Sequence, residues 1–275
     1  MSDPASGFFE GAPRLHYLEW NPRGRRTLVC LHGNSANAWW WQPMAEALGE
    51  LDFRILALDL RGHGESDWVH PPAYLPTDYA VDIARFLRGM ALADPVVIGH
   101  SMGGVCALAL VVNYPNLVRA TVVVDVAVTS SQRRNRYLQR LRALPTVTYP
   151  DLETAKARFR LMPNEGAIPP TTIAMIAEKS VGRTDNSRYT MKFDRESFFG
   201  GDGLDVVDAI SRVRIPLLLV RGERSRIMMA EAAERAATSN PRVRLTTIPA
   251  AHHHVLLERP ASLASTVREF VIGLV

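Results

Sequence analysis

The stretch Gly99-His100-Ser101-Met102-Gly103 lies between a short apolar run over residues 95–98 and a longer apolar run over residues 106–112. This order predicts a buried strand, a tight turn centred on Ser101, and a helix that follows at once. A serine in such a turn has a strained backbone, and its hydroxyl projects beyond the edge of the sheet. Only small residues two positions before and after it let the strand and the helix approach so closely. The context therefore predicts a nucleophilic serine; the alternative is an ordinary glycine-rich loop.

The composition is typical of a soluble globular enzyme. A chain of 275 residues with 47% hydrophobic residues can form one α/β domain with a sizeable core. No basic region followed by an apolar run opens the sequence, so no signal peptide is expected. The apolar run over residues 105–112 is too short to cross a membrane. Cys30 and Cys106 lie inside apolar runs and are predicted to be buried thiols, which favours a cytoplasmic location.

Basic charge is concentrated in one segment. Residues 130–195 hold 13 Lys and Arg against 6 Asp and Glu, although the whole chain has a net charge of only +4. This excess indicates either an anionic substrate or acidic carrier partner, or a solvated helical surface. The run Arg133-Arg134-Asn135-Arg136 has no interleaved aromatic residues, so binding to nucleic acid is not expected.

Apolar, strand-like segments alternate with longer amphipathic segments, which predicts an α/β fold with a mostly parallel sheet and helices on both faces. The expected strands are residues 15–20, 27–31, 55–59, 95–99, 120–126, 216–221 and 243–248. The expected helices are residues 39–48, 76–90, 102–112, 230–238 and 261–272. The alternation stops in a polar, proline-interrupted segment that we expect to form short helices. We therefore expect a core domain of residues 1–127 and 206–275, and an inserted helical lid of residues 128–205.

Four motifs occur in a fixed order along the chain. His32-Gly33-Asn34 follows the strand expected at 27–31, and Asp59-Leu60-Arg61-Gly62-His63-Gly64-Glu65-Ser66 follows the next one. The third motif is Gly99-His100-Ser101-Met102-Gly103-Gly104, and the fourth is Ala250-Ala251-His252-His253-His254-Val255-Leu256-Leu257-Glu258-Arg259-Pro260. In these motifs the chain resembles the α/β-hydrolase superfamily, and the likeness covers nearly all residues outside the expected lid. The resemblance implies an α/β-hydrolase fold and acyl transfer by a serine.

The serine needs an adjacent base, which is normally a histidine. Three consecutive histidines, His252, His253 and His254, compete for this role. In the superfamily the base typically stands five residues before the Glu of a Glu-x-Pro helix start, and counting back from Glu258 gives His253. A glycine usually precedes the base, but here His252 does, so His252 remains an alternative.

The acid of the triad departs from the superfamily pattern. It normally follows the strand expected at 216–221, where Ser225 and Arg226 occupy the corresponding places. An arginine cannot orient an imidazole or stabilise its cationic form. Some members place the acid after the preceding strand, and that resemblance makes Asp125 the predicted acid. Glu223, or a Ser–His pair without an acid, are the alternatives.

Negative charge that develops on a substrate oxygen needs donors already in place. The backbone N–H of Met102 at the start of a helix is one expected donor, and the resemblance implies the backbone N–H of Asn34 as the second, which completes an oxyanion hole. The predicted pocket residues are Trp39, Trp40, His100, Phe159 and Met162, and ordinary packing is the alternative role for these side chains.

These features predict a serine hydrolase that cleaves a small carboxylic ester or lactone through an acyl-enzyme; the substrate is anionic if the basic segment serves substrate binding and is not simply a solvated surface. No metal or cofactor is expected, because no ligand cluster with metal spacing is present. One alternative is a thioesterase or acyl-carrier esterase, for which the arginine-rich segment argues. The other is a ligand-binding receptor of the same fold that has lost hydrolysis, for which the missing acid argues.

Overall fold

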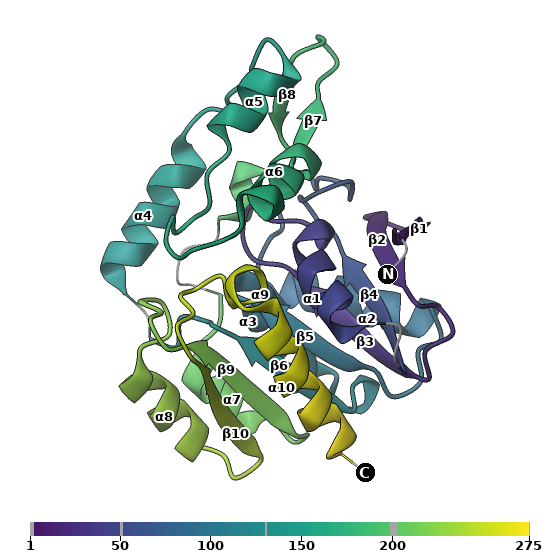
Figure 1. Cartoon of the computed structure of the whole chain (residues 1–275), viewed down its shortest axis with the longest axis vertical. Coiled ribbons are helices and arrows are strands. Elements are labelled where there is room, and N and C mark those ends of the chain that lie inside the picture. Colours follow the sequence, from purple (N-terminus) through teal and green to yellow (C-terminus); the bar gives the residue numbers. More distant parts are fainter. Residues whose placement is uncertain (1–2, 50–51, 130, 199–202, 275) are drawn as a thin grey trace.

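The computed structural model describes residues 3–49, 52–129, 131–198 and 203–274. An eight-stranded sheet forms its centre (Figure 1). The strands are β1 (Ala5–Phe9), β2 (Leu15–Trp20), β3 (Arg26–Leu31), β4 (Phe53–Leu58), β5 (Val96–His100), β6 (Ala120–Val124), β9 (Leu217–Gly222) and β10 (Val243–Ile248). They lie in the order β1-β2-β4-β3-β5-β6-β9-β10. The pairs β1–β2 and β2–β4 are antiparallel and all others are parallel.

Helices cover both faces of the sheet, so the parallel strands are apolar on both sides. In β3, Val29 and Leu31 point to one hydrophobic core, while Leu28 and Cys30 point to the other. The first core is covered by α2 (Pro76–Gly89), α3 (Met102–Asn113), α7 (Val206–Arg212) and α8 (Ala230–Thr238). The second is covered by the 3₁₀ helix η1 (Ala38–Trp41), α1 (Gln42–Leu48), α9 (Val255–Glu258) and α10 (Pro260–Ile272). A further 3₁₀ turn, η2 (Pro115–Leu117), follows α3.

Between β6 and β9 the chain leaves the sheet. It forms α4 (Gln132–Ala143), α5 (Leu152–Arg158), α6 (Pro170–Lys179), β7 (Val181–Arg183), β8 (Tyr189–Met191) and the 3₁₀ turn η3 (Arg195–Ser197) before α7 begins. In Figure 1, α4, α5, α6 and the β7–β8 hairpin lie together above the sheet. The expectation of helices alone was wrong for this hairpin. Its turn over residues 184–188 is closed by hydrogen bonds between Thr184 and Arg188, and Ser187 has a φ of 63°.

All seven expected strands are present, and the predicted α/β-hydrolase fold is confirmed. The strand β1 was missed because Ala5, Ser6 and Gly7 are weak strand formers at a sheet edge. The helix expected over residues 39–48 is divided into η1 and α1, with Pro43 in the first turn of α1. Cys30 and Cys106 are free and buried, as predicted. Within the described ranges, no helix combines the length and the apolarity that crossing a membrane would require.

Candidate active site

Ser101 lies in the sharp turn between β5 and α3. Its backbone angles are φ 53° and ψ −118°, and non-glycine residues rarely adopt such a positive φ. A Cβ on Gly99 would lie 2.2 Å from the carbonyl oxygen of Gly103, and a Cβ on Gly103 would lie 2.3 Å from that of Leu31. The strand and the helix therefore approach as closely as the sequence predicted, and only glycine fits at these two positions.

A line of hydrogen bonds joins Ser101, His253 and Asp125. His253 Nε2 lies 3.1 Å from Ser101 Oγ, and His253 Nδ1 lies 2.8 Å from Asp125 Oδ1. Asp125 directly follows β6, has a φ of 49°, and is fully buried. An ionised carboxylate can only accept hydrogen bonds, so Nδ1 donates to Asp125. The lone pair of Nε2 then faces the Ser101 hydroxyl.

Three donors converge on the Asp125 carboxylate. Besides His253, the hydroxyl of Ser225 donates to Oδ1 at 2.5 Å, and the backbone N–H of Gly222 donates to Oδ2 at 2.8 Å. A buried carboxylate is costly unless such hydrogen bonds replace its hydration. Ser225, which occupies a place where an acid was expected, therefore supports the carboxylate that comes from the neighbouring strand.

The other candidate acid lies elsewhere. Glu223 is exposed, and its carboxylate accepts a hydrogen bond from the backbone N–H of Ala250 at 2.8 Å. Arg226 is also exposed. The structure therefore brings Asp125, and not Glu223, to the imidazole of His253.

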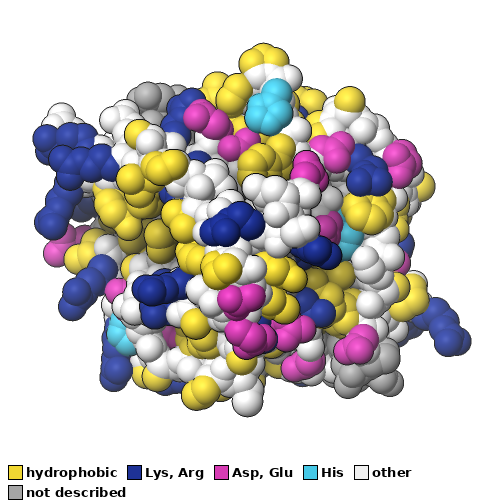
Figure 2. Space-filling view, turned by 90° about the horizontal axis from the view of Figure 1, so that it is seen from above, with side chains coloured by type: hydrophobic (Ala, Val, Ile, Leu, Met, Phe, Trp, Pro, Cys, Tyr) yellow, Lys and Arg dark blue, Asp and Glu magenta, His cyan; other side chains and the backbone are white. Residues whose placement is uncertain are grey.

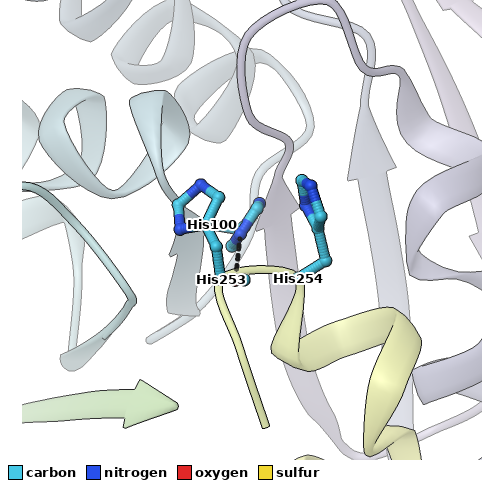
Figure 3. Close-up of side chains that lie close together, drawn as sticks. All are labelled: His100, His253 and His254. Carbon is cyan, nitrogen blue, oxygen red and sulfur yellow. Dashed lines mark hydrogen bonds between the residues drawn. The ribbon is translucent and has the colours of Figure 1, made fainter. Parts of the chain in front are cut away.

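The remaining histidines of the cluster have structural partners. His252 Nδ1 donates to the Glu258 carboxylate at 2.9 Å, so this ring is held by Glu258. His254 Nε2 donates to the carbonyl oxygen of Pro163 at 2.9 Å. His100 Nε2 donates to the backbone carbonyl oxygen of His253 at 3.0 Å, drawn as the dashed line in Figure 3. His100 thus fixes the backbone of the residue whose side chain contacts Ser101.

Burial keeps two of these rings uncharged. It lowers the pKa of His254 to about 3 and the pKa of His100 well below its ordinary value, and in both cases the nearby His253 adds to the effect. Neutral rings beside His253 do not compete with it for the Asp125 charge. This favours proton transfer at His253 alone.

The three rings of Figure 3 are spaced as a metal site would require, since His100, His253 and His254 can each offer a nitrogen and these atoms lie within 4.8 Å of one another. Both nitrogens of His253 already face partners, and Nε2 of the other two rings donates to a carbonyl. Only Nδ1 of His100 and Nδ1 of His254 retain a free lone pair. Zinc sites normally use three or four protein ligands, so the arrangement fits hydrogen bonding better than metal coordination.

A buried hydrogen-bond network positions the loop after β3, which carries Asn34. His32 Nδ1 donates to the carbonyl oxygen of Gly33 at 2.8 Å, and its Nε2 accepts from the backbone N–H of Leu60 at 3.0 Å. Asp59 accepts from the backbone N–H of Ala38 at 2.6 Å. These contacts tie the loop after β3 to the loop after β4.

A cavity of about 1100 Å³ opens at Ser101. Asn34, Met102 and His253 line it together with the serine. Met102 is the first residue of α3, so its N–H has no partner within the helix. Asn34 and Met102, the two residues expected to supply oxyanion donors, thus line the same cavity as Ser101. The expected pocket residue Met162 also lines the cavity.

Trp39 and Trp40 do not line this cavity, so their assignment to the pocket was wrong. Lys179 Nζ lies 4.2 Å from the ring centroid of Trp39. Trp40 is buried and packs edge-on against His254, with ring centroids 5.5 Å apart. The two rings therefore pack η1 against Lys179 of α6 and against His254.

The same correction applies to His100 and Phe159. His100 is buried behind Ser101 and contacts His253 instead of the cavity. Phe159 packs into the hydrophobic core that also contains α1 and α10.

The side of the cavity that α4 forms was not predicted from the sequence. Arg134, Tyr137, Leu138 and Leu141 line it. Their spacing of three, four and seven residues places them on one face of a helix. That periodicity was a usable signal, although the high charge of α4 obscured it.

Comparison with known proteins places the chain in a family. A model of the alpha/beta hydrolase family matches residues 28–266. The 2-(acetamidomethylene)succinate hydrolase of Mesorhizobium japonicum is 27% identical over 247 residues, which are 89% of this chain and 87% of the relative. Esterase Rv0045c of Mycobacterium tuberculosis is 29% identical over 263 residues, which are 94% of this chain and 86% of the relative.

Solved structures agree with these relatives. The crystal structure of E-2-(acetamidomethylene)succinate hydrolase superposes with a TM-score of 0.83 at 27% identity and covers 98% of this chain and 99% of that one. A refined structure of the Mycobacterium tuberculosis esterase gives 0.82 at 26% identity, over 98% and 93% of the two chains. With the family model spanning most of the sequence, the chain belongs to the alpha/beta hydrolase family of enzymes.

Proposed function

We propose that the protein is a serine hydrolase that cleaves a carboxylic ester or a lactone through an acyl-enzyme. The observation that carries the proposal is the hydrogen-bonded line from Ser101 through His253 to Asp125, which opens into the cavity. A hydroxyl becomes an effective nucleophile when an adjacent base accepts its proton. His253 Nε2 is at the right distance for that transfer.

In the first half-reaction, Ser101 Oγ forms a bond to the substrate carbonyl carbon while its proton passes to His253 Nε2. The carbonyl oxygen becomes an oxyanion, which the N–H groups of Met102 and Asn34 stabilise. The bond from carbon to the leaving oxygen then breaks, and that oxygen takes the proton from His253. An ester bond between the acyl group and Ser101 remains.

In the second half-reaction, water replaces the leaving group. His253 Nε2 accepts a proton from water as its oxygen bonds to the acyl carbon, and returns the proton to Ser101 Oγ as the acyl–serine bond breaks. While His253 is cationic, Asp125 stabilises the charge and holds the ring through Nδ1. The donors from Ser225 and Gly222 keep Asp125 in place during both steps.

Residues 128–205 act in this proposal as a lid that shapes the substrate pocket. Leu141 of α4, together with Leu161 and Met162, lines the cavity that also contains Ser101 and Met102. An apolar wall of this kind excludes water from the acyl group and strengthens the electrostatic interactions at the reacting carbon. The names of the relatives, an esterase and a hydrolase of a succinate derivative, support a small-molecule substrate.

Trapping of the acyl-enzyme tests the proposal. The wild type is mixed with p-nitrophenyl butyrate, quenched in acid and analysed by intact and peptide mass spectrometry beside Ser101→Ala. We expect release of p-nitrophenolate by the wild type and one butyryl group on the peptide that contains Ser101. Equal turnover by a folded Ser101→Ala variant, or a butyryl group on another residue, would refute the serine mechanism.

A further inference from the structure

We propose that Arg134 binds a carboxylate group of the substrate, so that the enzyme prefers esters whose acyl or alcohol part carries a negative charge. This inference rests on the proposed function and specifies its substrate class. Arg134 lines the same cavity as Ser101 and His253. A guanidinium group matches a carboxylate with two parallel hydrogen bonds.

Most of the hydrogen-bonding capacity of Arg134 is unused. Its Nη1 donates to the carbonyl oxygen of Thr129 at 3.1 Å, and this is the one side-chain hydrogen bond of Arg134 within the described residues. Among the residues that the structure describes, no acidic side chain forms an ion pair with Arg134. By contrast, Arg142 at the other end of α4 pairs with Glu196. Arg134 is therefore held by a neutral group and retains four N–H donors for a ligand.

Helix stability does not explain why an arginine occupies position 134 in α4. It is the third residue of the helix, after the N-cap Ser131, and the first turn contains no acidic side chain. The helix dipole disfavours positive charge in the first turn. A residue that breaks a local preference in this way is expected where function requires it.

Desolvation points in the same direction. Arg134 is half-buried, and burial lowers its pKa below the ordinary value for arginine. The guanidinium nevertheless stays charged near neutral pH, because its ordinary pKa is far above 7. A partly desolvated cation without a counter-charge is unfavourable. A substrate carboxylate would supply the missing charge.

The acidic residue at the cavity does not cancel this charge. Asp205 also lines the cavity but is exposed, and its carboxylate caps α7. Oδ1 accepts from the backbone N–H groups of Val207 and Asp208, at 2.9 and 3.0 Å. The helix N-terminus thus compensates the charge of Asp205, while the charge of Arg134 remains available.

The surroundings of α4 would also attract an anion. Arg133, Arg136 and Arg140 are exposed on this helix. Figure 2 shows Lys and Arg side chains gathered at the left edge of the molecule, the side on which α4 lies in Figure 1. Such a concentration of one charge raises the local concentration of oppositely charged substrates. Of the arginines in α4, however, only Arg134 lines the cavity.

A matched pair of substrates tests the proposal. Mono-p-nitrophenyl adipate carries a terminal carboxylate, and the corresponding p-nitrophenyl ester of adipic acid monoamide has a neutral carboxamide of nearly the same size. The ratio of their kcat/KM values is measured for the wild type, Arg134→Gln and the control Arg136→Gln. We expect the wild type to favour the carboxylate, and Arg134→Gln to reduce this ratio about 10- to 100-fold. Arg136→Gln, on the exposed side of the same helix, should leave the ratio within about twofold of the wild type.

The outcomes separate the two proposals. An unchanged ratio in Arg134→Gln, or an equal decrease in Arg136→Gln, would overturn the role of Arg134 while leaving the esterase proposal intact. If the wild type hydrolyses neither ester, the esterase proposal fails instead. Calorimetric binding of adipate to the two variants then decides the role of Arg134: specific loss of binding in Arg134→Gln supports it, and equal binding refutes it.

Discussion

Replacing Ser225 by alanine removes one of the three donors to Asp125 without touching His253 or Ser101. The lost bond is an O–H···O⁻ contact of 2.5 Å in a buried site, and a hydrogen bond to a charged group contributes about 1.5–3 kcal/mol. Two donors remain, His253 Nδ1 and the backbone N–H of Gly222, so the carboxylate stays in place. We therefore expect kcat to fall about 10-fold and Tm to fall by several degrees.

The assay is kcat and KM for p-nitrophenyl butyrate, with Tm from circular dichroism. Ser225→Thr retains the hydroxyl and should recover most of the activity, while Ser211→Ala, a serine on the exposed surface of α7, should behave as the wild type. The reasoning is refuted if Ser225→Ala keeps wild-type kcat and Tm. It is also refuted if KM alone changes, because Asp125 acts on the catalytic step.

Further predictions concern packing and acid stability. Gly103→Ala should lower the free energy of unfolding in urea by about 1–3 kcal/mol or more, because its Cβ would meet backbone oxygens of β3 and of the loop after it. The control Gly182→Ala should cost much less, because its Cβ would meet only the flexible side chain of a lysine. Equal costs in the two variants would show that close packing is not the reason for Gly103. Burial lowers the pKa of His63 to about 3. Below about pH 6.5 the unfolded chain therefore binds a proton at this ring that the folded chain excludes. The free energy of unfolding then falls by about 1.4 kcal/mol per pH unit as the pH decreases from about 6.5 to 3. Urea unfolding of His63→Gln between pH 7 and 4 should show a shallower decrease than the wild type; parallel curves would disprove this assignment.

The fold could be predicted because its signals are local. Each strand of the parallel sheet is a short apolar run, and each helix is a longer amphipathic one, so period and length distinguish them. The turn at Ser101 is recognisable in the sequence because close packing of the strand against the helix requires the glycines on either side of it. The hairpin β7–β8 was missed because each of its strands has only three residues, too few for a recognisable alternation of apolar and polar side chains. The strand β1 was missed because Ala5, Ser6 and Gly7 are poor strand formers.

The site could be predicted as far as the motifs extend. The resemblance to superfamily members whose acid follows the preceding strand predicts Asp125, and the structure places Asp125 against His253. The support from Ser225 could not be predicted, because it depends on how close the fold brings Asp125 and Ser225, which are 100 residues apart in the sequence. The pocket assignments failed for Trp39 and Trp40, since an aromatic residue near a catalytic loop can pack on either side of it.

The proposed triad takes its acid from the end of β6, and the decisive measurement is kcat of Asp125→Asn beside Glu223→Gln, with folding checked by circular dichroism. An amide at position 125 cannot stabilise the imidazolium and favours the wrong tautomer of His253. We therefore expect kcat to fall by about 10⁴-fold, while Glu223→Gln, which changes an exposed side chain, should stay within about twofold of the wild type. Near-wild-type kcat in Asp125→Asn, or a comparable loss in Glu223→Gln, would contradict the account.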